Sequence, residues 1–188
     1  MVRVLLRDHS DTQLLLCSRD RGRGEAAVAA VTAELGCPDR LELIILDVTS
    51  EESVQEAAAT VRARHGKLFG LINNAGGTAA SARATLQLNT FSLIRVCQAF
   101  LPLLQPAGRI VQISSGAAPM FVAKCDEAVK QFLVDPDITF AAVEDRLITP
   151  YLNIQEDAAL SEEEKTEALA SHGIGANVMG AYGLSKAG

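Results

Sequence analysis

Short apolar runs alternate along the chain with stretches whose apolar residues recur at helical spacing. Helical patterns cover Gly24–Leu35, the residues from about Thr49 to His65, and a longer stretch from about Thr85 that ends near Pro102. Strands that alternate with helices are typical of βαβ units and of a parallel sheet covered on both faces. The pattern therefore predicts an α/β fold with a doubly wound parallel sheet. Its expected strands are Gln13–Cys17, Leu41–Leu46, Leu68–Ile72 and Arg109–Ile113.

The pattern changes between Gly116 and Gly180, where no strand-like run occurs. Three glutamates stand in the first turn of the helix expected over Ser161–Ala170, where the helix dipole favours them. We expect residues 117–180 to form a helical insertion before the last segment, within a single partial domain of residues 1–188. Its other expected helices are Phe121–Leu133 and Ile138–Leu152.

Composition narrows the classes of function. The 188 residues hold 17 Lys and Arg against 23 Asp and Glu, a net charge of −6, which argues against a nucleic-acid partner because phosphate binding needs a basic face. No run approaches the roughly 18 apolar residues of a membrane span. The four cysteines are far apart, without a CxxC pair, so we expect no metal site, reduced thiols and a cytoplasmic protein.

Two strand ends carry candidate chemistry. The string Asn73-Asn74-Ala75-Gly76 follows one expected strand and Ser114-Ser115 follows another. Ligands of open parallel sheets bind at the carboxyl ends of the strands. Taken alone, each string is also explained as a plain turn or a helix cap.

Tyr182 and Lys186 are four residues apart, so on a helix they face the same side. A nearby cation favours the phenolate and lowers the pKa of a tyrosine from about 10, as acid–base chemistry near neutral pH requires. By itself the YxxxK spacing is also compatible with a solvated helix face.

The string NNAG, then Asn89 in a helix, Ser115 at a strand end and YxxxK, in this order on a βαβ background, resembles the short-chain dehydrogenase/reductase family. The resemblance runs the length of the chain and is closest to the carbonyl-reductase branch, which has a long block before the YxxxK helix. It implies a Rossmann-like sheet. It also implies a monomer, since the inserted block covers the surface that other members use to associate.

The same resemblance implies an enzyme that reduces the carbonyl group of a small molecule, a ketone, aldehyde or quinone, to an alcohol. Tyr182 would protonate the carbonyl oxygen and Ser115 would hydrogen-bond it. Lys186 would lower the tyrosine pKa and hold the nicotinamide ribose, and Asn89 would anchor the water that resupplies the proton. The resemblance assigns cofactor contacts to Asp47 and Val48 at the adenine and to Asn74 beside it, and names no particular substrate.

The end of the first expected strand indicates which cofactor is used. NAD enzymes carry an acidic residue there, and this chain has Ser18 followed by Arg19, whose guanidinium can pair with a 2′-phosphate. NADPH is therefore the expected cofactor. The alternative is that Arg19, Arg21 and Arg23 form a solvated loop at the start of a helix.

The chain departs from the family pattern near both ends. The family's first strand and TGxxxGxG loop, which binds the pyrophosphate, do not occur, and Met1–Asp8 aligns with the later half of the helix after that loop. We therefore expect an incomplete sheet, in which the strands ending at Cys17 and Ile72 pair directly, recruit another segment or keep open edges, and weak activity. The alternative function is a catalytically inactive remnant or an interaction module without cofactor binding.

Overall fold

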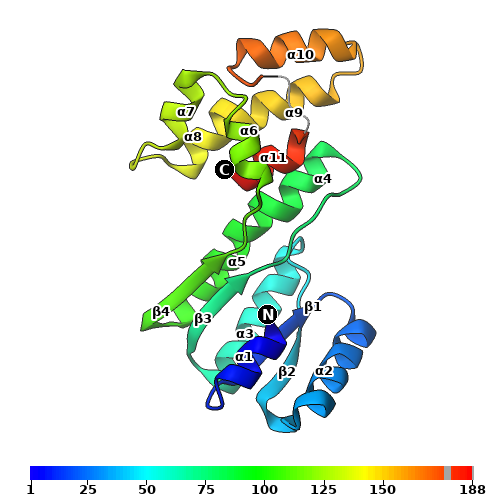
Figure 1. Cartoon of the computed structure of the whole chain (residues 1–188), viewed down its shortest axis with the longest axis vertical. Helices are drawn as coiled ribbons and strands as arrows, with labels where there is room; N and C mark the ends of the chain where they lie inside the picture. Colours follow the sequence, from blue (N-terminus) through cyan, green and yellow to red (C-terminus); the bar gives the residue numbers. More distant parts are fainter. Residues whose placement is uncertain (176–178, 188) are drawn as a thin grey trace. The chain divides into compact units, whose positions relative to one another are not determined.

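The computed structural model describes residues 1–175 and 179–187 of the 188. Two compact units make up the chain (Figure 1). The first unit contains residues 1–71 and 95–109, and the second contains residues 72–94 and 110–188. Strands β3 and β4 and helix α5 each have residues in both units.

In the first unit, helices alternate with strands as the hydrophobic pattern predicts. Strands β1 and β2 pair in parallel, with Leu14 opposite Leu41 and Ser18 opposite Ile45. The elements up to residue 73 are α1 (Val2–Asp8), β1 (Leu14–Ser18), α2 (Arg21–Leu35), the 3₁₀ turn Pro38–Arg40, β2 (Leu41–Ile45), α3 (Glu51–His65) and β3 (Leu68–Asn73).

The other strand pair is β3 with β4 (Leu104–Gln112). Gly108 lies against the carbonyl of Phe69, and the amide of Ile113 donates a hydrogen bond to the Asn73 carbonyl at 3.0 Å, so the two strands run in the same direction. Between them the chain forms α4 (Ala82–Leu86), the π-helical turn Gln87–Phe91, α5 (Ser92–Phe100) and the 3₁₀ turn Leu101–Leu103.

The core of the first unit lies between α3, the end of α5 and the strands. Buried α3 residues Val54, Ala58 and Val61 pack with Val96 and Phe100 of α5. Leu15 of β1 and Leu68 and Leu71 of β3 pack against the same cluster. Both strand pairs therefore rest on one hydrophobic core although they are separate sheets.

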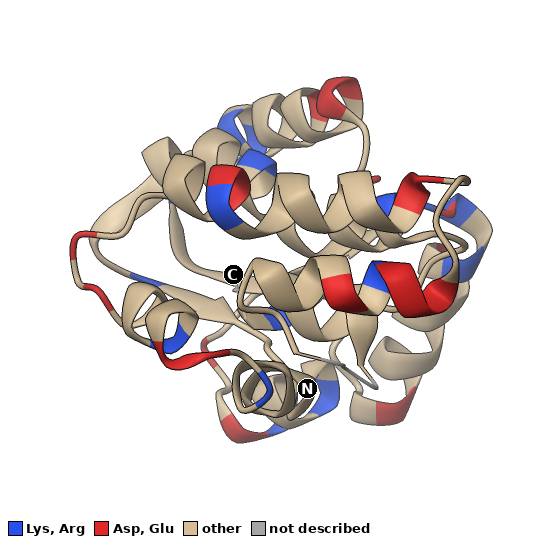
Figure 2. Cartoon of the chain, turned by 90° about the horizontal axis from the view of Figure 1, so that it is seen from above, with Lys and Arg blue, Asp and Glu red and all other residues tan. Residues whose placement is uncertain are grey.

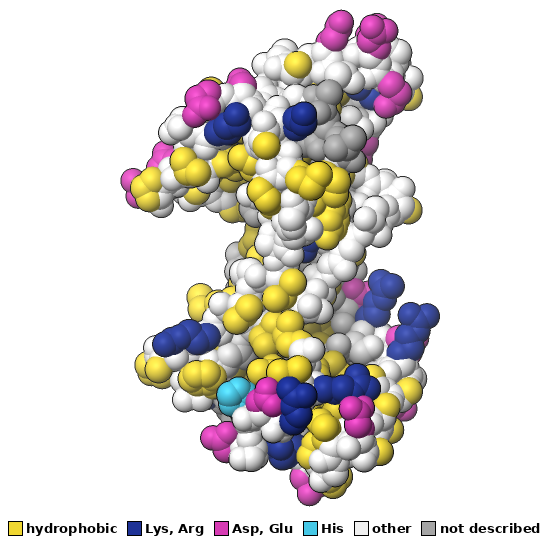
Figure 3. Space-filling view, viewed as in Figure 1, with side chains coloured by type: hydrophobic (Ala, Val, Ile, Leu, Met, Phe, Trp, Pro, Cys, Tyr) yellow, Lys and Arg dark blue, Asp and Glu magenta, His cyan; other side chains and the backbone are white. Residues whose placement is uncertain are grey.

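Of the three arrangements expected for the incomplete sheet, the structure has the open edges. Within residues 1–175 and 179–187, β1 pairs only with β2 and β3 only with β4, so the strand ends near Cys17 and Ile72 keep open edges rather than pairing directly. Yellow apolar side chains gather over β3 and β4 in Figure 3, and Phe69 is 63% exposed. The last strand begins at Leu104 instead of Arg109, five residues earlier than the sequence indicates.

The first residues of helices α2 and α3 differ from the expectation, because each helix begins directly after a residue whose side chain caps it. Helix α2 begins at Arg21, three residues early, since the Asp20 carboxylate accepts a hydrogen bond from the Arg23 amide at 2.7 Å. Ser50 caps α3 by accepting from the Ser53 amide. Thr49 therefore lies before the N-cap, outside the helix.

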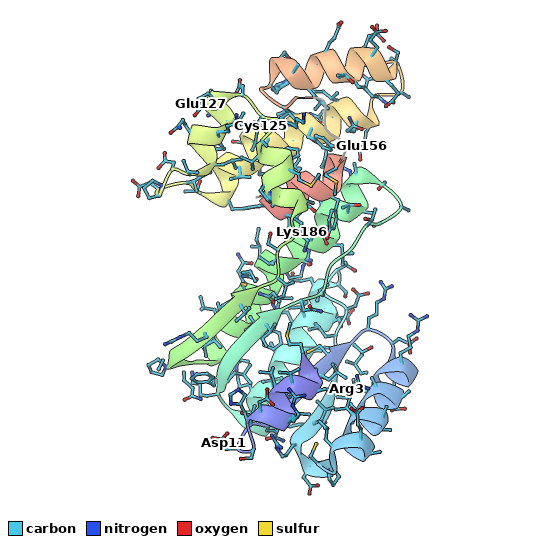
Figure 4. The ribbon with its side chains drawn as sticks, in the orientation of Figure 1. Arg3, Asp11, Cys125, Glu127, Glu156 and Lys186 are labelled. Carbon is cyan, nitrogen blue, oxygen red and sulfur yellow. The ribbon has the colours of Figure 1, made fainter. Side chains whose placement is uncertain are left out.

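The second unit is mostly helical, as expected for residues 117–180. Its core joins Phe121, Val129, Leu147 and Tyr151 of the insertion to Leu184 of the last helix. Ion pairing between Arg83 and Glu156, the latter labelled in Figure 4, connects α4 to α9. The elements are α6 (Ala117–Val122), α7 (Glu127–Leu133), α8 (Phe140–Val143), the π-helical turn Glu144–Ile148, α9 (Thr149–Glu156), α10 (Glu162–Ser171) and α11 (Gly180–Ala187).

The single helix expected over Phe121–Leu133 is two helices. The helical conformation is interrupted at Cys125, which pairs in an isolated antiparallel bridge with Ile174. A new helix, α7, then begins after Asp126, whose side chain caps it by accepting from the Val129 amide at 2.8 Å. The helix expected over Ile138–Leu152 is likewise α8, a π-helical turn and α9. The last expected segment is helix α11, except that Gly188 lies outside the described residues.

Charged residues of both signs are spread over the helices. Blue and red segments are interspersed over the helices in Figure 2. None of the helices among the described residues is both long and apolar enough to cross a membrane. Over the same part of the chain, no group of three His, Cys, Asp or Glu side chains is arranged to hold a metal ion.

Candidate functional site

Helix α11 brings Tyr182 and Lys186 to one side, as their spacing predicts. The Lys186 ammonium lies 6.0 Å from the centroid of the Tyr182 ring and donates a hydrogen bond to the Ile113 carbonyl at 3.3 Å. Lys186 is labelled on this helix in Figure 4. Gly183 allows α11 to approach α6 closely, because a Cβ there would lie 2.9 Å from the Cβ of Phe121.

Asn89 lies in the π-helical turn between α4 and α5 and is 4% exposed. Its side chain closes two hydrogen bonds with the backbone of Gly77: the Gly77 amide donates to Oδ1 and Nδ2 donates to the Gly77 carbonyl, both at 2.9 Å. Nδ2 also donates to the Ser185 hydroxyl at 2.9 Å. Asn89 therefore joins the loop after β3 to the helix that carries Tyr182 and Lys186.

Ser115 and Ser114 lie just after β4, close to the same helix in different ways. The Ser115 hydroxyl accepts from the Ala117 amide at 3.2 Å, at the start of α6. The Ser114 hydroxyl donates to the Lys186 carbonyl at 3.1 Å. Across residues 1–175 and 179–187, the Tyr182 hydroxyl forms no hydrogen bond, and hence none with Ser115.

The NNAG string begins with Asn73, the last residue of β3, and continues into the loop that follows. Asn74 is exposed there, and its amide donates to the Ile72 carbonyl at 3.1 Å. Gly76 lies tightly against the site, since a Cβ on it would be 2.9 Å from Oδ1 of Asn89 and 3.0 Å from Nζ of Lys186. The loop therefore lies in the same unit as Asn89, Ser115, Tyr182 and Lys186.

Arg19, Asp47 and Val48 belong to the first unit, at the carboxyl ends of β1 and β2. Arg19 is exposed and follows Ser18, whose hydroxyl donates to the Asp20 carbonyl at 2.8 Å. The Val48 carbonyl accepts from Arg95 at 3.1 Å. The alternative of a solvated loop formed by the three arginines needs correction. Arg21 and Arg23 lie in the first turn of α2, and only Arg19 precedes the helix.

Asp47 is held as a carboxylate. Its Oδ1 accepts from the Thr49 hydroxyl at 2.6 Å and from the Thr49 amide at 2.9 Å. These hydrogen bonds, side chain first, lower the pKa of Asp47, and the positive charge of Arg19 lowers it further. Because Ser18 lies opposite Ile45 in the parallel pair, Arg19 and Asp47 follow neighbouring strand ends.

Tyr151, the chain's other tyrosine, lies in the core of the second unit and differs from Tyr182 in its surroundings. It is 4% exposed, and burial raises the pKa of its phenol to about 12. Burial favours the neutral phenol. Tyr151 is thus suited to packing rather than to proton transfer near neutral pH.

Three residues of this site were not among those predicted from the sequence. Ser185 is 3% exposed and accepts from Asn89, Thr90 is 5% exposed and donates from Oγ1 to the Ser185 carbonyl at 3.1 Å, and Gly77 holds the Asn89 amide. The position of Ser185 beside Lys186 is the only local hint. Their roles depend on contacts between residues far apart in the chain.

Comparisons with known proteins give the family of the chain. Residues 2–130 match the family described as short chain dehydrogenase. Carbonyl reductase (NADPH) 1 of Bos taurus is 33% identical over 148 residues, which are 74% of this chain and 52% of that protein. Its Homo sapiens counterpart is 30% identical over 182 residues, 92% of this chain and 63% of that protein. The chain therefore spans between about half and two thirds of the length of these relatives.

Solved structures share the fold. Menthone neomenthol reductase from Mentha piperita superimposes with a TM-score of 0.78 over 99% of this chain and 76% of that one, at 21% identity. A short-chain dehydrogenase/reductase from Brucella melitensis covers 63% of this chain and 52% of its own, with a TM-score of 0.53 and 25% identity. The likeness confirms the predicted α/β fold class, an incomplete Rossmann-like fold.

Proposed function

Because the chain belongs to the short-chain dehydrogenase family, we propose that it reduces the carbonyl group of a ketone, aldehyde or quinone to an alcohol with NADPH. The observation that carries the proposal is the pairing on α11 of the Tyr182 phenol with the Lys186 ammonium, 6.0 Å from the ring. Asn89 is hydrogen-bonded to the same helix turn. The carbonyl reductases of Bos taurus and Homo sapiens carry NADPH in their names, which supports the choice of cofactor.

Two side chains of the second unit act on the substrate oxygen in different ways. Tyr182 is the proton donor, and its hydroxyl has no partner among the described residues that would compete for the proton. Ser115 has one acceptor position filled by the Ala117 amide and keeps its O–H for the substrate oxygen. The donated hydrogen bond stabilises negative charge that develops on that oxygen.

Lys186 and Asn89 act on the proton donor. The Lys186 ammonium would stabilise the negative charge left on Tyr182 after proton transfer, and it would hold the nicotinamide ribose. Asn89 anchors the water through which the proton is resupplied. A bound nicotinamide cofactor supplies the hydride for this chemistry.

The residues at the ends of β1 and β2 fit the adenosine end of NADPH. Ser18 occupies the position of the acidic residue that would bind the 2′-hydroxyl of NAD, and its hydroxyl is used by the backbone of Asp20. Arg19 is exposed and forms no ion pair within 4 Å in the part of the chain that the structure describes, so its guanidinium is available for a 2′-phosphate. In this proposal Asp47 and Val48 would hold the adenine, and Asn74 would line the cofactor beside it.

The proposal also covers the size of the substrate, the oligomeric state and the location of the protein. The substrate is a small carbonyl compound, and the helical insertion keeps the protein monomeric. All four cysteines are free thiols. The proposed location is the cytoplasm, where thiols stay reduced.

Titration of NADPH, followed by its fluorescence, tests the proposal. We expect saturable binding that is weak for the 188-residue chain, because its sequence holds no TGxxxGxG loop to donate backbone hydrogen bonds to the pyrophosphate. Turnover of an aromatic aldehyde, an aliphatic ketone and a quinone should lie below the roughly 1 s⁻¹ at the low end of typical enzymes. Absence of binding at millimolar NADPH would instead support a catalytically inactive interaction module.

A further inference from the structure

Ser185 is a buried junction between the helix that carries Tyr182 and Lys186 and the π-helical turn that carries Asn89. It is 3% exposed, and its hydroxyl donates to the Tyr182 carbonyl at 2.9 Å. A hydroxyl has one proton, so its remaining capacity is to accept, and Nδ2 of Asn89 donates to it at 2.9 Å. One oxygen thus links the backbone of the proposed proton donor to Asn89.

The orientation of the Asn89 amide follows from its partners. The Gly77 amide requires an acceptor and the Gly77 carbonyl requires a donor, so Oδ1 faces the first and Nδ2 faces the second. The second hydrogen of Nδ2 goes to Ser185. Both hydrogens of Nδ2 are therefore used, and any rotation of the amide breaks at least one bond in a buried environment.

A parallel contact strengthens this connection. Thr90, the residue after Asn89, donates from Oγ1 to the Ser185 carbonyl at 3.1 Å. Two consecutive side chains of the π-helical turn thus bind the hydroxyl and the carbonyl of one residue. Because Ser185 lies between Tyr182 and Lys186, this single turn of α11 is fixed against Asn89.

We infer that Ser185 is a positioning residue: its hydroxyl keeps the Asn89 side chain in a fixed position relative to Tyr182 and Lys186. The inference rests on the proposed function, because the position it maintains is that of the proton donor and of the residue that resupplies the proton. The Ser185 hydroxyl acts through Asn89 and Tyr182 and touches neither substrate nor cofactor.

The test compares Ser185→Ala with Ser92→Ala. Ser92 is also 3% exposed, and its hydroxyl donates to the Leu88 carbonyl within its own helical segment, so this control removes an equally buried hydroxyl. Ser185→Ala should lower kcat about 10- to 100-fold, as small misplacements of reacting groups do, and change KM less than about threefold. It should also move the limb of the pH–rate profile that reports the proton donor, while Ser92→Ala leaves kcat, KM and the profile unchanged.

Two further variants separate hydrogen bonding from packing. Ser185→Cys nearly preserves the volume but supplies only a weak hydrogen-bonding group, so its kcat should fall as in Ser185→Ala. Full activity of Ser185→Cys would show that the residue only fills space and would overturn the inference. If Ser185 acts through Asn89, the double variant Ser185→Ala/Asn89→Ala should lose no more activity than Asn89→Ala alone, and multiplied losses would also overturn it.

A readout independent of turnover separates this inference from the proposed function. Hydrogen exchange of the Asn89 side-chain amide, followed by NMR, should be slow in the unsubstituted chain and in Ser92→Ala, and at least 10-fold faster in Ser185→Ala. An unsubstituted chain that exchanges slowly but reduces no carbonyl would contradict the proposed function alone. Equal exchange in the unsubstituted chain and Ser185→Ala would overturn the role of Ser185, whatever the activity.

Discussion

Gly76 lies directly against Lys186: a Cβ on Gly76 would be 3.0 Å from Nζ of Lys186 and 2.9 Å from Oδ1 of Asn89. Neighbouring Gly77 has no atom within 4 Å of its own Cβ position. The two adjacent glycines of the loop after β3 therefore tolerate a methyl group very differently. The difference offers a matched pair of substitutions at the proposed site.

Gly76→Ala should displace the Asn89 amide and the Lys186 ammonium and lower kcat by at least about 10-fold. The stability cost should be about 1 to 3 kcal/mol, because the crowded Oδ1 of Asn89 belongs to a buried, hydrogen-bonded amide. Steady-state kinetics and urea unfolding measure the two effects. Gly77→Ala is the control, and an equal loss of activity in both variants would contradict the explanation.

Tyr182→Phe should abolish carbonyl reduction, because it removes the proposed proton donor and keeps the ring. Tyr151→Phe is the control, since Tyr151 is the chain's other tyrosine and its phenol lies in the core with a pKa raised to about 12 by burial. Turnover with saturating NADPH should be lost in the first variant and retained in the second. Unchanged turnover of Tyr182→Phe would show that another group donates the proton.

Arg19→Ala should weaken NADPH binding roughly 10- to 100-fold, the loss typical of a charged hydrogen-bonded pair, and leave NADH binding nearly unchanged. Fluorescence titrations of both cofactors give the ratio. Arg21→Ala is the control, because Arg21 lies 3.6 Å from Glu25 on the exposed side of α2. Equal weakening of NADPH and NADH by Arg19→Ala would remove Arg19 from recognition of the 2′-phosphate.

Local periodicity predicted much of the fold. The strands of the first unit and α3 follow from apolar spacing, and the shared side of Tyr182 and Lys186 follows from a separation of four residues. The apolar pattern predicts the start of β4 too late, at Arg109 instead of Leu104, because Pro106 and Gly108 interrupt the pattern within the strand. The separation into two strand pairs depends on pairing between distant segments, which local spacing does not encode.

Long-range contacts also explain what the sequence left out of the site. Asn89 and Ser185 are 96 residues apart, and their hydrogen bond depends on how α11 packs in the second unit. The break at Cys125 arises from its bridge to Ile174, which no nearby breaker residue signals. The roles of Ser115, Tyr182, Lys186 and Asn89 remain predictions that the kinetic variants test.

Asp47 should make the stability of the chain depend on pH. Hydrogen bonds from Thr49 and the charge of Arg19 lower the pKa of Asp47 in the folded state, so the folded state favours the carboxylate more than the unfolded chain does. The stabilisation is complete above the unfolded value of about 3.9 and is lost as the pH falls through the lower folded value. Urea unfolding followed by circular dichroism should show Asp47→Asn less stable than the unsubstituted chain at pH 7.

The difference should shrink as the pH falls through the lowered pKa of folded Asp47, because below it the carboxyl is protonated in both states. Asp39→Asn is the control for the loss of a carboxylate, because Asp39 is exposed in the 3₁₀ turn before β2. High salt should reduce the contribution of Arg19, which acts through space, more than that of the Thr49 hydrogen bonds. A difference that persists undiminished at low pH would mean that Asp47 stabilises the fold through shape rather than charge.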